Sequence, residues 1–139
     1  MKIYHDRLSI KTKGFCHVVN ITDNVLALLK KSGIHEGLLC VFVVGSTAAL
    51  TTVEYEPGLV KDLEEIFEKL VPQNGRYHHE ETWHDGNGFS HVRASLLKPS
   101  ITIPVVESGL TLGTWQQIVL LDFDNHPRTR SVAVQIMGK

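Results

Sequence analysis

The stretch richest in side chains that can do chemistry is RYHHEETWHDGNGFSH, residues 76–91. It holds four of the eight histidines of the chain, interleaved with glutamate and aspartate. Neutral imidazoles bind zinc and similar divalent metals, and carboxylates complete such sites. The spacing matches no specific metal motif, so the competing interpretation is a solvated loop whose histidines hydrogen-bond locally.

His91 differs from the other histidines because it opens the run HVRASLL, which we predict to be a strand. A side chain at the end of a strand is held more rigidly than one in a loop, which suits a metal ligand or a general base. The preceding DGNG turn carries Asp85 and Asn87. Its alternate glycines can expose backbone N–H groups to an anion, although a plain turn is the simpler interpretation.

Hydroxyl groups gather in GSTAALTTVE, residues 45–54. Ser46 and Thr47 follow a glycine at the end of an apolar run, where their hydroxyls could bind phosphate oxygens. The segment has neither the spacing of a P-loop nor a GxSxG elbow. Glu54 follows a run of neutral residues and is the acid that we most expect in a cleft, with a role as helix cap as the alternative.

Further candidates lie in the C-terminal third of the chain. Trp115 could stack on a flat ring and Gln116 could bind polar edges, although a single tryptophan is more often part of a core. Arg128 and Arg130 form a pair that suits phosphate or carboxylate recognition, with a simple surface pair as the alternative.

Two helices are predicted among the elements that must position these residues. In ITDNVLALLKKSG, Thr22 and Asp23 are capping candidates and Gly33 is a stop signal. EPGLVKDLEEIFEKLVP places apolar side chains on one face and acids on the other, and Pro72 ends it.

Most of the remainder is predicted to form strands. The segments are KIYHDRLSI, GLLCVFVV, STAALTTVE, HVRASLL, SITIPVVE, TWQQIVLLDFD and TRSVAVQIM. GLLCVFVV is an unbroken apolar run, so we expect it to be buried on both faces. DNHPRTR is predicted to join the last two strands as a hairpin, and Asp122 and Asp124 before it could hold Mg²⁺ or belong to a solvated turn. The order of elements favours an α+β fold with largely antiparallel or mixed sheets, a sandwich-like core and two main helices.

Composition narrows the class of protein. A length of 139 residues predicts one domain over residues 1–139. The formal net charge of −1 argues against nucleic acid or an anionic membrane surface as a partner. No apolar run approaches the ~18 residues of a membrane span. The two cysteines are not spaced as a metal or redox pair, so we expect a reduced, cytoplasmic protein.

Taken together, these segments resemble the YjbQ family, often labelled the secondary thiamine-phosphate synthase family. The resemblance covers nearly the whole chain. It rests on the hydroxyl-rich strand ending in Glu54, on NGRYHHE, on DGNGFSHVRASLL and on IPVVESGLTLGTWQQIVLLDFDNHPRTRSVAVQIMG. The GTWQ and PRTR sequences are its most specific parts. The resemblance implies an α+β fold that assembles as a homotrimer.

The resemblance also implies a polar cleft. Carried over position by position, its residues are Glu54, His79, His91, Trp115, Gln116 and Arg130, with Asp85 and Asn87 in a looser stretch. We assign catalytic roles to Glu54, His91 and Arg130. We assign substrate binding to Ser46, Thr47, Asp85, Asn87, Trp115, Gln116 and Arg128. We assign metal binding to His79, His84 and His91.

One departure from the family pattern concerns Gly45. Many members carry a histidine there, in a His-Thr-Ser or His-Thr-Thr triplet, whereas this chain has Gly-Ser-Thr. If that imidazole is a ligand or base in the relatives, this chain must replace it or lack its role. His84, in the WHDGN variant of the loop, is our candidate replacement.

The family label implies a reaction that joins a hydroxymethylpyrimidine diphosphate to a thiazole phosphate and releases diphosphate. Such chemistry needs Mg²⁺ or cationic side chains, for which Arg128, Arg130 and Lys98 are available. Three functions stay open. They are a zinc- or magnesium-dependent enzyme with thiamine-phosphate-synthase-like activity, a metal-dependent hydrolase of a phosphorylated small molecule, and a non-catalytic trimeric binder of an anionic metabolite.

Overall fold

The computed structural model describes residues 1–139, with eight strands and four helices. In chain order they are β1 (Lys2–Thr12), β2 (His17–Asn20), α1 (Thr22–Ser32), β3 (Gly37–Val44), β4 (Ala48–Glu54), α2 (Pro57–Leu70), α3 (His79–Trp83), α4 (Gly88–Leu97), β5 (Ser100–Val106), β6 (Gly109–Leu110), β7 (Gln116–Asp122) and β8 (Arg128–Gly138).

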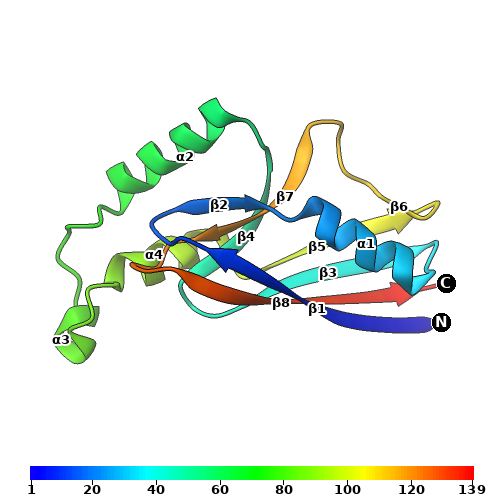
Figure 1. The fold of residues 1–139 in the computed structure, drawn as a ribbon, viewed down its shortest axis with the longest axis horizontal. Coiled ribbons are helices and arrows are strands. Elements are labelled where there is room, and N and C mark those ends of the chain that lie inside the picture. The colour runs from blue at the N-terminus through cyan, green and yellow to red at the C-terminus, as the bar shows by residue number, and fades with distance from the viewer.

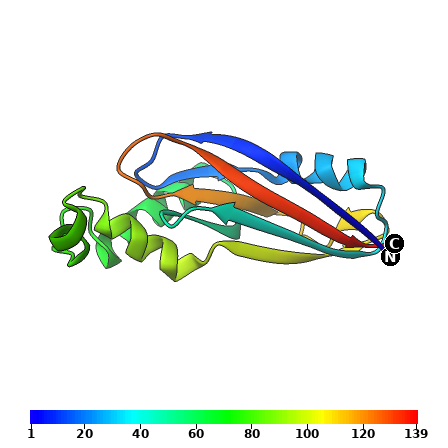
Figure 2. The same cartoon turned by 90° about the horizontal axis from the view of Figure 1, so that it is seen from below.

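The strands form two sheets in which every neighbouring pair is antiparallel. The large sheet has five strands in the order β1-β8-β3-β5-β6, and the small sheet has three in the order β2-β7-β4. Helices α3 and α4 lie at one end of the molecule, while both termini lie at the other (Figure 1 and Figure 2). The predicted α+β class with antiparallel sheets is confirmed.

Two hydrophobic clusters hold the layers together. The larger has 18 buried residues from α1 and from the facing sides of the two sheets, including Leu39, Val134 and Leu120. The smaller has eight and lies between the small sheet and helices α2 and α4. There the rings of Phe67 and Phe123 lie 4.8 Å apart between centroids. The small sheet is therefore the middle layer, buried on both faces.

Both predicted helices are present, but side chains other than the expected ones cap them. At the start of α1, Asn20 Oδ1 accepts a hydrogen bond from the backbone N–H of Thr22, and Gly33 closes the helix with a φ of 66°. At the start of α2, the carboxylate of Glu56 accepts hydrogen bonds from the N–H groups of Gly58 and Leu59. Glu54 is therefore not the helix cap.

The prediction of a strand at HVRASLL is wrong, because these residues belong to α4. Its buried residues include Phe89, Ser90, Arg93 and Ala94, which have the spacing of one helix face. With α3 included, the fold has two short helices in addition to the two predicted. No helix is long enough and apolar enough to cross a membrane.

Two strand predictions also need correction. β3 is buried on one face only: Leu39, Val41 and Val43 face the core, while Leu38 and Phe42 are exposed. The DNHPRTR segment is not a hairpin loop. It joins β7 of the small sheet to β8 of the large sheet, so the two strands never pair.

Candidate functional site

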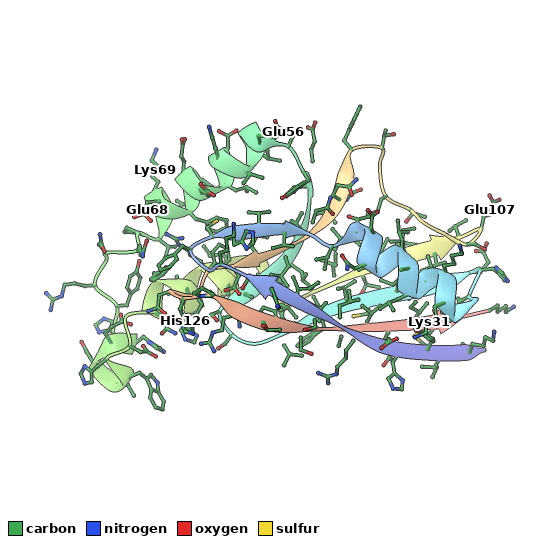
Figure 3. The ribbon with its side chains drawn as sticks, in the orientation of Figure 1. Lys31, Glu56, Glu68, Lys69, Glu107 and His126 are labelled. Carbon is green, nitrogen blue, oxygen red and sulfur yellow. The ribbon has the colours of Figure 1, made fainter.

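The candidate site lies at the end of the molecule where α3, α4 and the link between β7 and β8 meet. His126 marks this link in Figure 3. His79 is the first residue of α3 and His91 lies in the first turn of α4. Their rings pack against each other, with centroids 4.4 Å apart and planes inclined by 34°. The fold thus brings together two of the histidines assigned to metal binding.

The local sequence explains why the two short helices meet at this point. His84 takes a left-handed conformation that ends α3, and Gly86 has a φ of 70° in the turn that follows. The N–H of Gly88 then donates a 2.8 Å hydrogen bond to Glu80 Oε1. A Cβ at position 88 would lie 2.7 Å from Glu80 Oε2, so only glycine lets α4 start against this carboxylate.

His79, Glu80 and Asp85 form a group of potential metal ligands. One donor atom from each lies within 4.8 Å of the others. His79 Nδ1 is 3.4 Å from Glu80 Oε1 and 3.5 Å from Asp85 Oδ1. One imidazole with two carboxylates is a donor set that fits zinc, and the carboxylates also suit magnesium.

His91 is held in its neutral form beside this group. Burial lowers the pKa of its imidazole, and the nearby His79 lowers that pKa further. The charges of Asp124, Asp85 and Glu80 oppose these effects without cancelling them. A neutral imidazole at physiological pH can serve as a metal ligand or accept a proton.

Beneath the histidines, Arg130 and Asp122 form a buried ion pair. Arg130 Nε donates to Asp122 Oδ2 at 2.6 Å and Nη2 donates to Oδ1 at 2.8 Å. Thr12 donates a further hydrogen bond of 2.6 Å to the same carboxylate. Asp122 is therefore committed to a paired arginine and is not free to hold Mg²⁺.

Asp124 is the second acid of this buried network. Burial raises its pKa, but hydrogen bonds from the N–H of Asn125 and from the side chains of Asn87, Arg128 and Thr47 outweigh this effect, so the pKa lies below its ordinary value. Arg128 donates at 2.8 Å and Thr47 at 3.0 Å. The oxygen Oδ1 of Asn87 is buried and has no hydrogen-bond partner.

An open cleft of about 520 Å³ lies beside His91. Its lining residues come from the β3–β4 loop and from the end of α4: Gly45, Ser46, Ala48, His91, Ala94, Ser95, Lys98 and Pro99. Most of the exposed lining surface is apolar, and its polar groups come from Ser46, His91, Ser95 and Lys98, which can orient a ligand.

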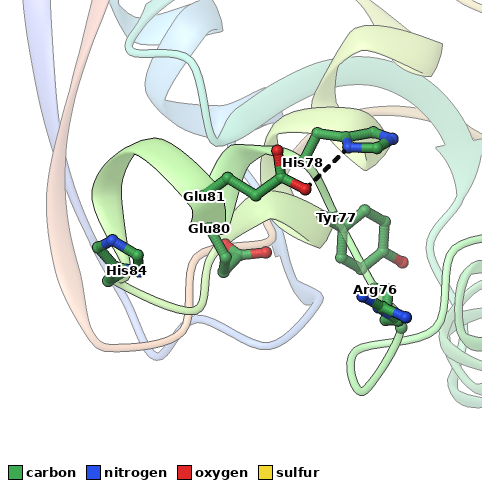
Figure 4. A pocket seen from close by; sticks show the side chains of 7 residues that line it. Arg76, Tyr77, His78, Glu80, Glu81 and His84 are labelled. Carbon is green, nitrogen blue, oxygen red and sulfur yellow. Dashed lines mark hydrogen bonds and ion pairs between the residues drawn. The ribbon is translucent and has the colours of Figure 1, made fainter.

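His84 lies outside the donor group, although the hollow that it lines shares Glu80 with that group. It lines a hollow of about 470 Å³ together with Arg76, Tyr77, His78, Glu80 and Glu81. Figure 4 shows His84 and His78 on opposite sides of the two glutamates, with His78 3.2 Å from Glu81. His84 is not part of the donor group around His79, so the structure gives no support for His84 as the replacement for a histidine at position 45.

Three other predicted site residues lie at the far end of the small sheet. In the pairing of β4 with β7, Glu54 faces Gln116 and Ala48 faces Asp122. The two pairs are six positions apart along each strand, which corresponds to about 20 Å at ~3.3 Å per residue. Trp115 is 72% exposed and lines a hollow of about 430 Å³ with Glu54. Gln116 donates to Thr52 at 2.8 Å.

One chain therefore brings most, but not all, of the predicted residues together. At or beside the cleft and histidine group are Ser46, Thr47, His79, Asp85, Asn87, His91, Arg128 and Arg130. Lys98, which the sequence analysis named only as an available cation, and Glu80, which it did not assign to the site, join them. In the sequence, Glu80 was only one of several acids in the loop. Its hydrogen bond with Gly88 at the start of α4 depends on a helix that the sequence analysis did not predict.

Comparison with known proteins places the chain among relatives along its whole length. A family model described as "UPF0047 protein YjbQ-like" matches residues 6–139. A UPF0047 protein of Methanothermobacter thermautotrophicus is 38% identical over 139 residues, which is 100% of this chain and 95% of that protein. One from Archaeoglobus fulgidus is 39% identical over 94% of this chain and 98% of its own length.

Solved structures share the fold. A YbjQ-like protein of unknown function from Sulfolobus solfataricus has a TM-score of 0.94 at 33% identity, covering 99% of both chains. A hypothetical protein from Aeropyrum pernix K1 has a TM-score of 0.91 at 32% identity, covering 98% of this chain and 99% of its own.

Proposed function

The chain belongs to the YjbQ-like family of UPF0047 proteins, and we propose that it is a metal-dependent hydrolase of a phosphorylated small molecule. The observation that carries the proposal is the group of His79, Glu80 and Asp85, packed against His91 at the edge of a cleft that also contains Ser46 and Lys98. A single chain contains this whole arrangement.

In this proposal, His79, Glu80 and Asp85 hold a divalent metal, zinc or magnesium. The metal, when bound, supplies a Lewis acid and lowers the pKa of water. The helix start at Gly88 fixes Glu80 through the 2.8 Å hydrogen bond from its N–H, which keeps this carboxylate oriented. These contacts hold the donor group in place independently of the ligand.

His91 has the role of general base. Its lowered pKa leaves the imidazole unprotonated at neutral pH, so it can accept a proton from water as the water oxygen attacks phosphorus. The same proton can then pass to the leaving oxygen of the substrate. Asp124 and Asp122 act indirectly, because they neutralise Arg128 and Arg130 behind the cleft.

Thiamine-phosphate-synthase-like activity is the second candidate. The exposed Trp115, beside Glu54, favours it because an indole face suits a pyrimidine or thiazole ring. Trp115 and Glu54 lie at one end of the small sheet, whereas His91 on α4 lies near the other end. A synthase site that combined these residues would need a second subunit. The homotrimer that the resemblance implies would supply one, and we include that trimer in this second proposal.

Metal content and hydrolysis, measured on matched histidine variants, test the first proposal. Wild type, His79→Ala and His84→Ala would be loaded with zinc, dialysed and analysed for metal per chain. We expect one zinc per chain in wild type and in His84→Ala, the control outside the donor group, and none in His79→Ala. Wild type and His84→Ala should hydrolyse p-nitrophenyl phosphate, and His79→Ala, which lacks zinc, should not.

Three outcomes contradict the hydrolase proposal. Equal loss of metal in His84→Ala and His79→Ala would show that the assigned donor group is wrong. Stoichiometric metal without hydrolysis of any phosphomonoester, but with diphosphate release when a pyrimidine diphosphate and a thiazole phosphate are both supplied, would favour the synthase. Tight anion binding with neither metal nor turnover would favour a non-catalytic binder.

A further inference from the structure

We infer that the cleft beside Gly45 is a phosphoryl-binding subsite, in which Arg130 Nη1, the Ser46 hydroxyl and the Lys98 ammonium bind the oxygens of one phosphoryl group. This inference deepens the proposed function, since it names where the phosphorylated substrate would bind. The three groups come from β8, the β3–β4 loop and the end of α4, and none of them belongs to the donor group around His79.

The first observation concerns the unused nitrogen of Arg130. The residue is only 6% exposed, and its Nε and Nη2 donate to Asp122 and Thr47. Nη1 has no hydrogen-bond partner within the chain, and it is not among the buried polar atoms left unsatisfied, so its N–H groups are open to water or a ligand. A buried cation with two unused N–H groups on one side is poised to bind an anion there.

Gly45 connects this nitrogen with the cleft. A Cβ at position 45 would lie 2.8 Å from Arg130 Nη1, and the backbone φ of 139° is one that other residues rarely adopt. Gly45 is exposed and lines the cleft next to Ser46. Arg130 itself does not line the cleft, so a ligand there would meet its Nη1 only past Gly45, where no side chain stands between them.

Lys98 supplies a cation on the other side of the cleft. It lines the cleft, is exposed and forms no ion pair with any residue of the chain. Its backbone has φ 85° and ψ 159°, a region occupied almost only by glycine. Hydrogen bonds hold this conformation: its N–H donates to Ala94 and its carbonyl accepts from Leu50, each at 3.1 Å.

The charges favour a phosphoryl group over a neutral ligand. Asp124 balances the exposed Arg128 and Asp122 balances the buried Arg130, so Lys98 leaves the cleft with an uncompensated positive charge. A tetrahedral phosphoryl group has enough oxygens to meet a guanidinium edge, a hydroxyl and an ammonium at once. A phosphoryl dianion also carries more negative charge than a carboxylate, so the positive charge of Lys98 favours it.

The test measures inorganic phosphate binding to protein from which metal has been removed by chelation and dialysis. Calorimetry would compare wild type with Lys98→Gly, which removes the charge but suits the backbone conformation and so should not unfold the chain. Lys69→Met is the matched control, since Lys69 lies on α2 away from the cleft (Figure 3). We expect Lys98→Gly to bind phosphate about tenfold more weakly and Lys69→Met to bind it normally.

A second readout addresses Arg130 without replacing it. Phosphate should shift the side-chain NMR signals of one buried arginine in wild type. The inference is overturned if wild type does not bind phosphate, if both lysine variants lose affinity equally, or if acetate binds as well as phosphate. Phosphate binding without any metal site would uphold the subsite and refute the metal-dependent hydrolase. Metal-dependent hydrolysis without phosphate binding to the metal-free protein would uphold the hydrolase and refute the subsite.

Discussion

Replacing Asp122 by asparagine removes the charge that balances Arg130 while leaving the shape of the side chain unchanged. Asp122 ends β7 of the small sheet, and Arg130 lies near the start of β8 in the large sheet, so the pair connects the two sheets. Asp122 is fully buried and receives two hydrogen bonds from Arg130, at 2.6 and 2.8 Å. The variant leaves a buried guanidinium facing an amide.

The structure also sets the expected size of the effect. Removal of one partner from a buried ion pair typically destabilises a protein by about 3–5 kcal/mol. Asp124 Oδ2 lies 3.8 Å from Arg130 Nη2 and remains as a partial counter-charge. We therefore expect a loss near the lower limit, about 3 kcal/mol, which corresponds to a fall in Tm of roughly 10 °C for a domain of this length.

Urea unfolding followed by far-ultraviolet circular dichroism, at one protein concentration, measures this loss. The double variant Asp122→Asn with Arg130→Met should be no less stable than Asp122→Asn, because the uncompensated charge is gone. Lys31→Met is the surface control. Lys31 forms a 3.0 Å ion pair with Asp6, and the two side chains are 67% and 36% exposed. The urea midpoint of Lys31→Met should equal that of wild type. A change below ~0.5 kcal/mol in Asp122→Asn would refute the reasoning.

Two further predictions concern acid stability and the packing of α2. Because hydrogen bonds lower the pKa of Asp124 below 3.8, its ionised form stabilises the fold above that pH, and this contribution disappears as the pH falls through the lowered pKa. The unfolding free energy should therefore fall less steeply below pH 3.8 in Asp124→Asn than in wild type, and equal slopes would contradict this. Phe67→Ala should cost about 3–5 kcal/mol, since Phe67 is 5% exposed and contacts Phe123, whereas Leu70→Ala, at 62% exposure, should change the urea midpoint little.

The fold could be predicted from the sequence where its signals are local. The period of apolar residues and the stop signals at Gly33 and Pro72 were enough to place α1 and α2. HVRASLL was too short to separate a period of two from a period of 3.6, and the glycines before it were interpreted as part of a turn. Gly88 instead opens α4, because Glu80 occupies the space where a side chain would lie.

The site could be predicted only in part, for a physical reason. The sequence indicated the histidine-rich loop, but which side chains converge depends on how two sheets and two short helices meet. The pairing of Asp122 with Arg130 crosses between sheets, so no strand register could reveal it. The same is true of Gly45 and Arg130, which are 85 positions apart in the sequence and in contact in the fold.

The positions of β7 and β8 in their sheets determine when this protein can fold during synthesis. Each is a central strand, yet both come from the last quarter of the chain. Until β8 leaves the ribosome, β1 and β3 have no common partner, and both present open edges to other nascent chains. The two sheets can therefore form only after β7 and β8 have been synthesised, and loss of β8 would remove an interior strand of the large sheet rather than an edge strand.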